Sequence, residues 1–165
     1  MNTLCILLGG NLGDVKSNFK KAHLLLQETI GLVSKTSNIY KSEAWGYQSD
    51  SVFLNQVLII ETEKNPFGIL SDTQAIEKTI GRKNKSENQV YSDRLIDIDI
   101  LFFNNEIIET NQLTIPHPRL HLRNFTLSPL HEIIPEFKHP KLNKSIDWLN
   151  KHCEDKSVCT PISKA

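Results

Sequence analysis

Two carboxylates in one apolar run are the strongest candidates for chemistry in this 165-residue sequence. Asp97 and Asp99 are separated by a single residue, so in a β-strand their side chains point to the same face. Two such carboxylates repel each other and lose solvation, and a hard dication between them removes both penalties. The spacing predicts a magnesium site, although two aspartates facing water on a half-exposed sheet would produce the same pattern.

Basic residues near the two aspartates would suit a polyphosphate. Arg94 lies three residues before Asp97, while Arg82 and Lys85 open a polar stretch that ends at Asp93. Arginine can grip phosphate oxygens in a bidentate fork and stabilise charge during phosphoryl transfer. The alternative for each cation is a solvated surface side chain, and for the lysines of the stretch we favour that alternative.

Other polar residues are candidates for nucleotide contact. His117 sits between two prolines in a stiff extended segment and can donate a hydrogen bond to a phosphate oxygen, but a purely structural histidine fits equally well. Gln74 and Glu77 share a face of a predicted helix. They either touch a nucleotide, or Glu77 pairs with a basic neighbour.

An aromatic ring and an amide share one face of another predicted strand. Phe53 and Asn55 are two residues apart, so their side chains project together. A ring that stacks and an amide that reads an edge would suit a flat, polar heterocycle. A core phenylalanine beside a strand-edge asparagine is the commoner origin of this pattern.

The elements that must position these residues follow from apolar periodicity and from turn residues. Strands are predicted at Leu4–Leu8, near Ser37–Lys41, at Phe53–Thr62 and at Leu95–Phe103, with helices at Asp14–Ile30 and from Pro66 to Ile80. The run Gly9-Gly10-Asn11-Leu12-Gly13 lacks the Gly-Lys-Ser/Thr ending of a phosphate loop, so we interpret its glycines as turn residues. The order predicts an α+β, ferredoxin-like βαββαβ core with an antiparallel sheet and a C-terminal extension of short helices and strands.

Composition narrows the class of protein. The length predicts one domain over residues 1–165, and the sequence leaves open whether the tail at about 151–165 is ordered or flexible. Lys plus Arg and Asp plus Glu both number 19, which gives no global basic field for nucleic acid. Three cysteines without a Cys-x-x-Cys pair argue against a disulfide framework and a structural zinc site. We expect a cytoplasmic monomer that binds neither nucleic acid nor membranes.

Taken together, the motifs resemble the 6-hydroxymethyl-7,8-dihydropterin pyrophosphokinase family of folate biosynthesis. The resemblance covers a core at about residues 3–137, and its order and spacing are specific although each motif alone is weak. It is carried by Gly9-Gly10-Asn11-Leu12-Gly13, Phe53-Leu54-Asn55, Gln74-Ala75-Ile76-Glu77, Gly81-Arg82, Arg94-Leu95-Ile96-Asp97-Ile98-Asp99-Ile100-Leu101-Phe102, Leu113-Thr114-Ile115-Pro116-His117 and Arg123-Asn124-Phe125.

The resemblance implies a reaction and its ligands. The β,γ-pyrophosphoryl group of ATP would pass to the hydroxymethyl group of the reduced pterin, and AMP would be released. Asp97 and Asp99, together with the ATP phosphates, would hold two Mg²⁺ ions, and Asp97 would also face the pterin hydroxymethyl group. The pterin would lie between the rings of Phe53 and Phe125, with Asn55 reading its edge.

The resemblance also assigns further contacts. It places two arginines, Arg82 and Arg94, at the transferring phosphates. The implied nucleotide contacts are Gln74, Glu77, Arg82, Lys85, Ile100, Thr114, His117 and Arg123. The implied additional pterin contacts are Ser42, Ala44, Trp45 and Tyr91.

The sequence departs from the family pattern in the loops. Ser42-Glu43-Ala44 stands where Thr-Pro-Pro is common, and Tyr91-Ser92-Asp93 stands where Trp-Gly-Pro is usual. Asn84 replaces a basic residue, and Pro118 replaces an aromatic one. None of these changes removes a predicted metal ligand.

Two other classes of protein stay open on the sequence. One is a non-catalytic ligand-binding or regulatory module of the same architecture, with solvated aspartates and no ATP binding. The other is a different enzyme on this fold, such as a nucleotidyltransferase, which would release pyrophosphate. The products distinguish them, because only the pyrophosphokinase makes AMP and a pterin diphosphate.

Overall fold

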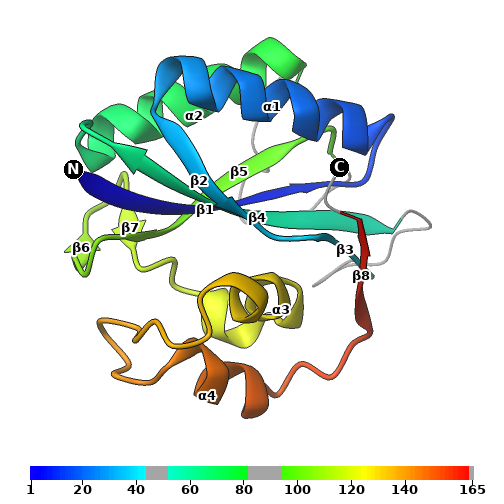
Figure 1. Cartoon of the computed structure of the whole chain (residues 1–165), viewed down its shortest axis with the longest axis vertical. Coiled ribbons are helices and arrows are strands. Elements are labelled where there is room, and N and C mark those ends of the chain that lie inside the picture. Colours follow the sequence, from blue (N-terminus) through cyan, green and yellow to red (C-terminus); the bar gives the residue numbers. More distant parts are fainter. Residues whose placement is uncertain (44–51, 82–93, 164–165) are drawn as a thin grey trace.

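One antiparallel sheet organises the computed structural model, which describes residues 1–43, 52–81 and 94–163 (Figure 1). Neighbouring strands run in the order β5-β1-β4-β3-β8, and β2 also pairs with β4. The strands are β1 (Asn2–Gly10), β2 (Leu32–Thr36), β3 (Ile39–Ser42), β4 (Phe53–Thr62), β5 (Asp97–Phe103) and β8 (Cys159–Ser163). A separate hairpin contains β6 (Ile108–Glu109) and β7 (Thr114–Ile115).

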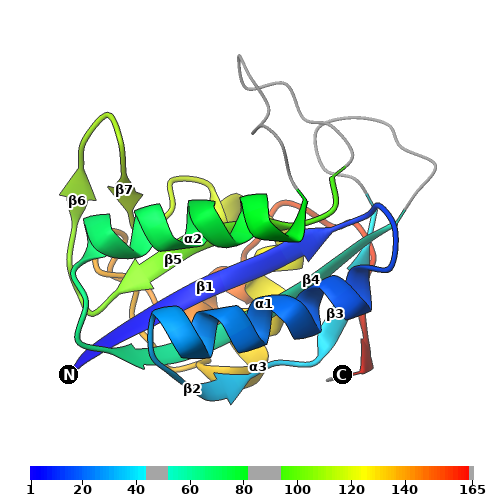
Figure 2. The same cartoon turned by 90° about the horizontal axis from the view of Figure 1, so that it is seen from above.

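Helices cover both faces of the sheet (Figures 1 and 2). α1 (Val15–Thr29) and α2 (Pro66–Ile80) lie over one face, while α3 (Asn124–Ile133) and α4 (Ile146–Lys151) lie under the other. A 3₁₀ turn, Leu120–Leu122, precedes α3. None of the helices in the described ranges is long and apolar enough to cross a membrane.

Strand β1 supplies side chains to both hydrophobic cores. Leu4, Ile6 and Leu8 pack in the core under α1 and α2. Cys5 and Leu7 pack in the core that includes residues of α3 and α4. This division follows from the strand, because successive side chains project to opposite faces.

Local signals predicted α1 and α2 well. Asp14 caps α1 by accepting a hydrogen bond from the backbone N–H of Ser17, and Asn65 caps α2 through the N–H of Gly68. Gly81 ends α2 with a φ of 126°. The strand Phe53–Thr62 is confirmed at both ends. Strand β2 was not predicted, because its side chains are mostly exposed and show no apolar alternation.

The interpretation of Gly9 and Gly10 as turn residues was wrong. Both belong to β1, and only Gly13 of this run has a positive φ, at 68°. A Cβ atom on Gly10 would lie 2.7 Å from the backbone oxygen of Leu95. Gly10 is therefore required for the close approach of two backbone segments, just before β5 begins.

We predict that Gly10→Ala lowers the free energy of unfolding by about 1–3 kcal/mol, the usual cost of overpacking. The neighbouring atom belongs to the backbone and has little room to move. Gly68→Ala is the matched control, since the nearest atom to its added Cβ lies at 3.6 Å; it should leave stability unchanged or raise it by about 1 kcal/mol. Urea unfolding measures both, and equal stabilities of the two variants would contradict the close-approach argument.

Candidate active site

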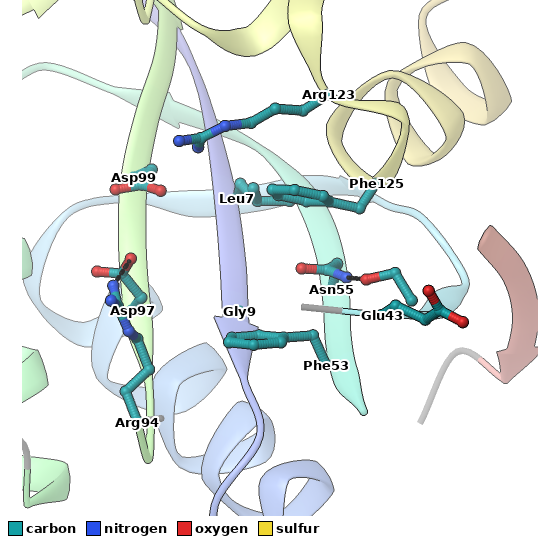
Figure 3. A pocket seen from close by; sticks show the side chains of 11 residues that line it. Leu7, Gly9, Glu43, Phe53, Asn55, Arg94, Asp97, Asp99, Arg123 and Phe125 are labelled. Atoms are coloured by element: carbon teal, nitrogen blue, oxygen red, sulfur yellow. Dashed lines mark hydrogen bonds and ion pairs between the residues drawn. The ribbon is translucent and has the colours of Figure 1, made fainter. Parts of the chain in front are cut away.

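A pocket of about 520 Å³ lies where the sheet meets the start of α3 (Figure 3). It is partly open to solvent. The lining residues come from β1, β3, β4, β5 and the first turn of α3, together with Glu43, Arg94 and Arg123, the N-cap residue of α3. They are Leu7, Gly9, Ser42, Glu43, Phe53, Asn55, Arg94, Asp97, Asp99, Arg123 and Phe125.

Strand register explains why these residues meet. Gly9 on β1 pairs with Asn55 on one side and with Asp97 on the other. Since neighbouring strands are about 4.8 Å apart, the backbones of Asn55 and Asp97 are separated by roughly 10 Å. The missing side chain at Gly9 leaves the floor of the pocket open between an amide and a carboxylate. Leu7 pairs with Asp99 and continues this floor.

The amide of Asn55 is held in one orientation. Asn55 is only 2% exposed, and its Nδ2 donates to the Oγ of Ser42 at 2.8 Å. A Cβ atom on Gly9 would lie 3.5 Å from the Asn55 Oδ1. Ser42, which was predicted as a substrate contact, therefore lines the pocket and also positions Asn55.

Two aromatic rings flank Asn55. Phe53 projects from the start of β4 and Phe125 from the first turn of α3, and Figure 3 shows the rings on opposite sides of the amide. Phe53 is half-buried and lines the pocket, so its ring is available to a ligand. The guanidinium carbon of Arg123 lies 5.5 Å from the centroid of the Phe125 ring. A slot flanked by two aromatic rings and an amide suits a flat, polar heterocycle.

Asp97 and Asp99 lie on the same face of β5, as predicted, and Ile96, Ile98 and Ile100 are buried. The Nη1 of Arg94 donates to the Oδ2 of Asp97 at 2.9 Å. Both side chains of this pair are largely buried, at 13% and 18% exposed. Figure 3 shows the guanidinium of Arg123 directed toward Asp99. The partly buried carboxylates therefore lie among cationic groups, which lowers the cost of removing them from water.

The charges of Asp97 and Asp99 act on the pKa of His117. Burial lowers the pKa of His117, and the negative charge of Asp99 opposes that shift more strongly than Asp97 does. The backbone N–H of Arg119 donates to His117 Nδ1 at 3.1 Å. The neutral ring therefore carries its proton on Nε2 and can donate it to an anion.

Glu77 supports the strand that carries the aspartates. It is 3% exposed, and its Oε1 accepts a hydrogen bond from the backbone N–H of Ile98 at 3.1 Å. Ile98 lies between Asp97 and Asp99, so Glu77 fixes the outer edge of β5 at this point.

The other predicted nucleotide residues are not among those lining the pocket. Gln74 is exposed on α2, Thr114 is half-buried in β7, and Ile100 is buried in the core beneath α1 and α2. The backbone N–H of His117 donates to the oxygen of Leu101, which places residues 114–117 beside the outer edge of β5. The nucleotide roles of these residues stay predictions.

Several predicted residues lie outside the described ranges, namely Ala44, Trp45, Arg82, Lys85 and Tyr91. Leu7 and Glu43 line the pocket and were not predicted as contacts. Leu7 could have been found from the alternation of β1, which puts it on the same face as Gly9. The sequence contains no comparable signal for Glu43.

Comparison with known proteins decides the family. The model of the 7,8-dihydro-6-hydroxymethylpterin-pyrophosphokinase (HPPK) family matches residues 5–135. The chain belongs to the HPPK family. Two relatives, both named 2-amino-4-hydroxy-6-hydroxymethyldihydropteridine pyrophosphokinase, are each 39% identical to it. The Bacillus subtilis protein aligns over 95% of this chain and 96% of its own length, and the Aquifex aeolicus protein over 88% and 89%.

Solved structures share the fold of this HPPK-family chain. The crystal structure of Plasmodium falciparum HPPK-DHPS with pteroate superposes with a TM-score of 0.75 at 18% identity. The match covers 91% of this chain and 44% of the Plasmodium chain. At this identity the likeness concerns the arrangement of helices and an antiparallel sheet.

We predict that the pKa of His117 lies below that of an unperturbed histidine, because burial disfavours the imidazolium. Asp99→Asn should lower this pKa further, since it removes the charge that favours the imidazolium most. Asp97→Asn should have the same effect to a smaller extent. Titration of the imidazole nitrogens by NMR in the HPPK-family protein measures all three. A pKa that rises in Asp99→Asn would contradict the placement of His117 beside this carboxylate.

Proposed function

We propose that this HPPK-family protein transfers the pyrophosphoryl group of ATP to 6-hydroxymethyl-7,8-dihydropterin, giving AMP and the pterin diphosphate for folate biosynthesis. The observation that carries the proposal is one pocket that combines a heterocycle slot with two carboxylates. Phe53, Asn55 and Phe125 form the slot, and across β1 from it lie Asp97, which pairs with Gly9, and Asp99, which pairs with Leu7. The distance across Gly9 suits a bicyclic ring whose hydroxymethyl arm reaches toward Asp97.

The donor set fits magnesium. No group of three or more His, Cys, Asp or Glu side chains within residues 1–43, 52–81 and 94–163 could hold a metal ion. Two carboxylates alone suit a cation that keeps water and phosphate oxygens as its other ligands. Asp97 and Asp99 would hold two Mg²⁺ ions together with ATP. When bound, the metal would neutralise the phosphates and stabilise the attacking and leaving oxygens.

The chain's own residues would orient and neutralise the reactants. Phe53 and Phe125 would stack on the pterin, while Asn55, fixed by Ser42, would read its edge. Arg123 and the Nε2 proton of His117 would donate to phosphate oxygens, and Arg94 would assist from its position beside Asp97. Such transfer depends on positioning and electrostatic stabilisation more than on a covalent nucleophile.

The nucleotide would bind on the other side of the aspartates from the pterin. Gln74, Ile100 and Thr114 belong to α2, β5 and β7, which lie near one another in Figure 2. We propose that ATP lies along this outer side of β5, with its phosphates pointing toward Asp97 and Asp99. The roles of Arg82, Lys85, Ala44, Trp45 and Tyr91 in closing the site rest on the family resemblance.

We also propose a ferredoxin-like core, because the strand order β5-β1-β4-β3 with two helices on one face is compatible with that arrangement. One domain over residues 1–165, a monomeric state, a cytoplasmic location and the absence of nucleic-acid or membrane partners stay predictions from the sequence.

The decisive assay follows products from ATP, magnesium and the reduced pterin. The wild type should release AMP, and Asp97→Asn and Asp99→Asn should each lower kcat by about 10²–10³, as expected when a charge-stabilising group is lost. Asp147→Asn is the matched control, since this aspartate lies on α4 and pairs with Lys151; its rate should be unchanged. Release of pyrophosphate in place of AMP, or full rates in both pocket variants, would refute the proposal.

A second prediction separates the two substrates. Phe53→Ala should raise the pterin KM about tenfold or more, because it removes one stacking wall, whereas the KM for ATP should change less than twofold. Phe67→Ala, on the exposed side of α2, is the aromatic control and should leave both constants unchanged. Steady-state kinetics with each substrate varied in turn measure the effect, and equal changes in both KM values would argue against stacking.

A further inference from the structure

The C-terminal segment, residues 153–163, lies against two walls of the pocket although none of its described residues lines it. It follows α4, passes the start of α3 and returns to the sheet as β8 (Figure 1). The HPPK family model matches only residues 5–135, so this segment lies beyond the matched region. The family match therefore does not account for the contacts that this segment makes with the pocket walls.

The first set of contacts holds the start of α3. The Oδ2 of Asp155 accepts a hydrogen bond from the backbone N–H of Asn124 at 3.0 Å. The Nδ2 of Asn124 donates to the backbone oxygen of Ser157 at 2.8 Å. Asn124 lies between Arg123 and Phe125, and both of these neighbours line the pocket. The segment thus holds Asn124, which lies between two residues that line the pocket, through two hydrogen bonds.

Asp155 is itself held in place. Its Oδ1 accepts hydrogen bonds from the backbone N–H of Ser157 at 3.0 Å and from the Ser157 Oγ at 2.6 Å. Although burial works to raise it, these bonds and the one from Asn124 keep the pKa of Asp155 below its ordinary value. A fixed carboxylate at the N-terminus of α3 also interacts favourably with the helix dipole. The side chain of Arg123, the N-cap residue, makes no capping bond, so this acceptor comes from a distant part of the chain.

The second set of contacts holds the opposite wall. β8 pairs with β3 in an antiparallel ladder in which Cys159 lies opposite Ser42. Ser42 in turn accepts the hydrogen bond that orients Asn55. Ser128 of α3 interacts with the Cys159 thiol, and the Ser128 hydroxyl donates a hydrogen bond to the Oδ1 of Asn124. One segment therefore connects the Phe125 wall and the Asn55 wall.

We infer that Asp155 is a positioning residue for the heterocycle slot, acting through Asn124 on the placement of Phe125 in the first turn of α3. The inference rests on the proposed function for the identity of the heterocycle. It concerns the spacing of the two walls, and it assigns Asp155 no contact with either substrate. Loss of the carboxylate should let the first turn of α3 shift, and the pterin should be affected more than ATP.

The test uses the full chain and three variants. Asp155→Ala should raise the pterin KM about tenfold, while kcat and the KM for ATP stay within twofold of the wild type. Asn124→Ala keeps its backbone N–H but loses the bond to Ser157, and it should raise the pterin KM in the same direction. Glu154→Ala is the matched control, because Glu154 is the exposed neighbour of Asp155; it should change nothing.

Binding of the reduced pterin, measured by calorimetry with Mg²⁺ and a non-hydrolysable ATP analogue, separates this inference from the proposed function. If the wild type makes no AMP, the proposed function is refuted. The role of Asp155 is then decided by comparing the pterin affinities of the variants and the wild type. A wild type that makes AMP, with unchanged pterin affinity in Asp155→Ala and Asn124→Ala, refutes the inference alone. If kcat falls and both KM values rise by similar factors, Asp155 has a general structural role, and the inference is also refuted. If Asp155→Ala does not fold, Asn124→Ala decides.

Discussion

The site depends on one missing side chain in the central strand. On the α3 side of the sheet, β1 presents Cys5 to the core, Leu7 to the core and to the pocket, and then Gly9 to the pocket. Any larger residue at position 9 would occupy the space between Asn55 and Asp97, which pair with Gly9 from opposite sides. The alternation of side chains along β1 therefore builds the two hydrophobic cores. At Gly9 the same alternation ends the core on the α3 side and opens the pocket.

Charge balance is the second constraint, and it acts on the strand next to Gly9. Two carboxylates on one face of a largely buried strand are unfavourable unless opposite charges are near. Arg94 pairs with Asp97 directly, and Arg123, the residue before α3, is directed toward Asp99. Glu77 adds support from the outer edge by accepting the N–H of Ile98. The carboxylates are thus held in one geometry by groups from three separate parts of the chain.

Local patterns predicted the parts of the fold and of the site that depend on local physics. Apolar residues at helical spacing placed α1 and α2, and alternation put Asp97 with Asp99, and Phe53 with Asn55, on shared faces. Phe125 was assigned to the site by family resemblance, since no periodicity brings it to Asn55. The hydrogen bond from Asn124 to Asp155 joins residues that are 31 positions apart, so no local sequence pattern predicts it.

The pocket walls show why directional contacts matter beyond the hydrophobic cores. Apolar packing holds α3 against the sheet through residues such as Leu127 and Leu130, but it is non-directional and tolerates small shifts along the helix axis. Hydrogen bonds weaken steeply with angle and distance. Glu132 fixes one end of α3 to Asn38 and Tyr40, and Asp155 fixes the other through Asn124. With both ends pinned, the Phe125 ring keeps a defined separation from Asn55, which stacking on a flat ligand requires.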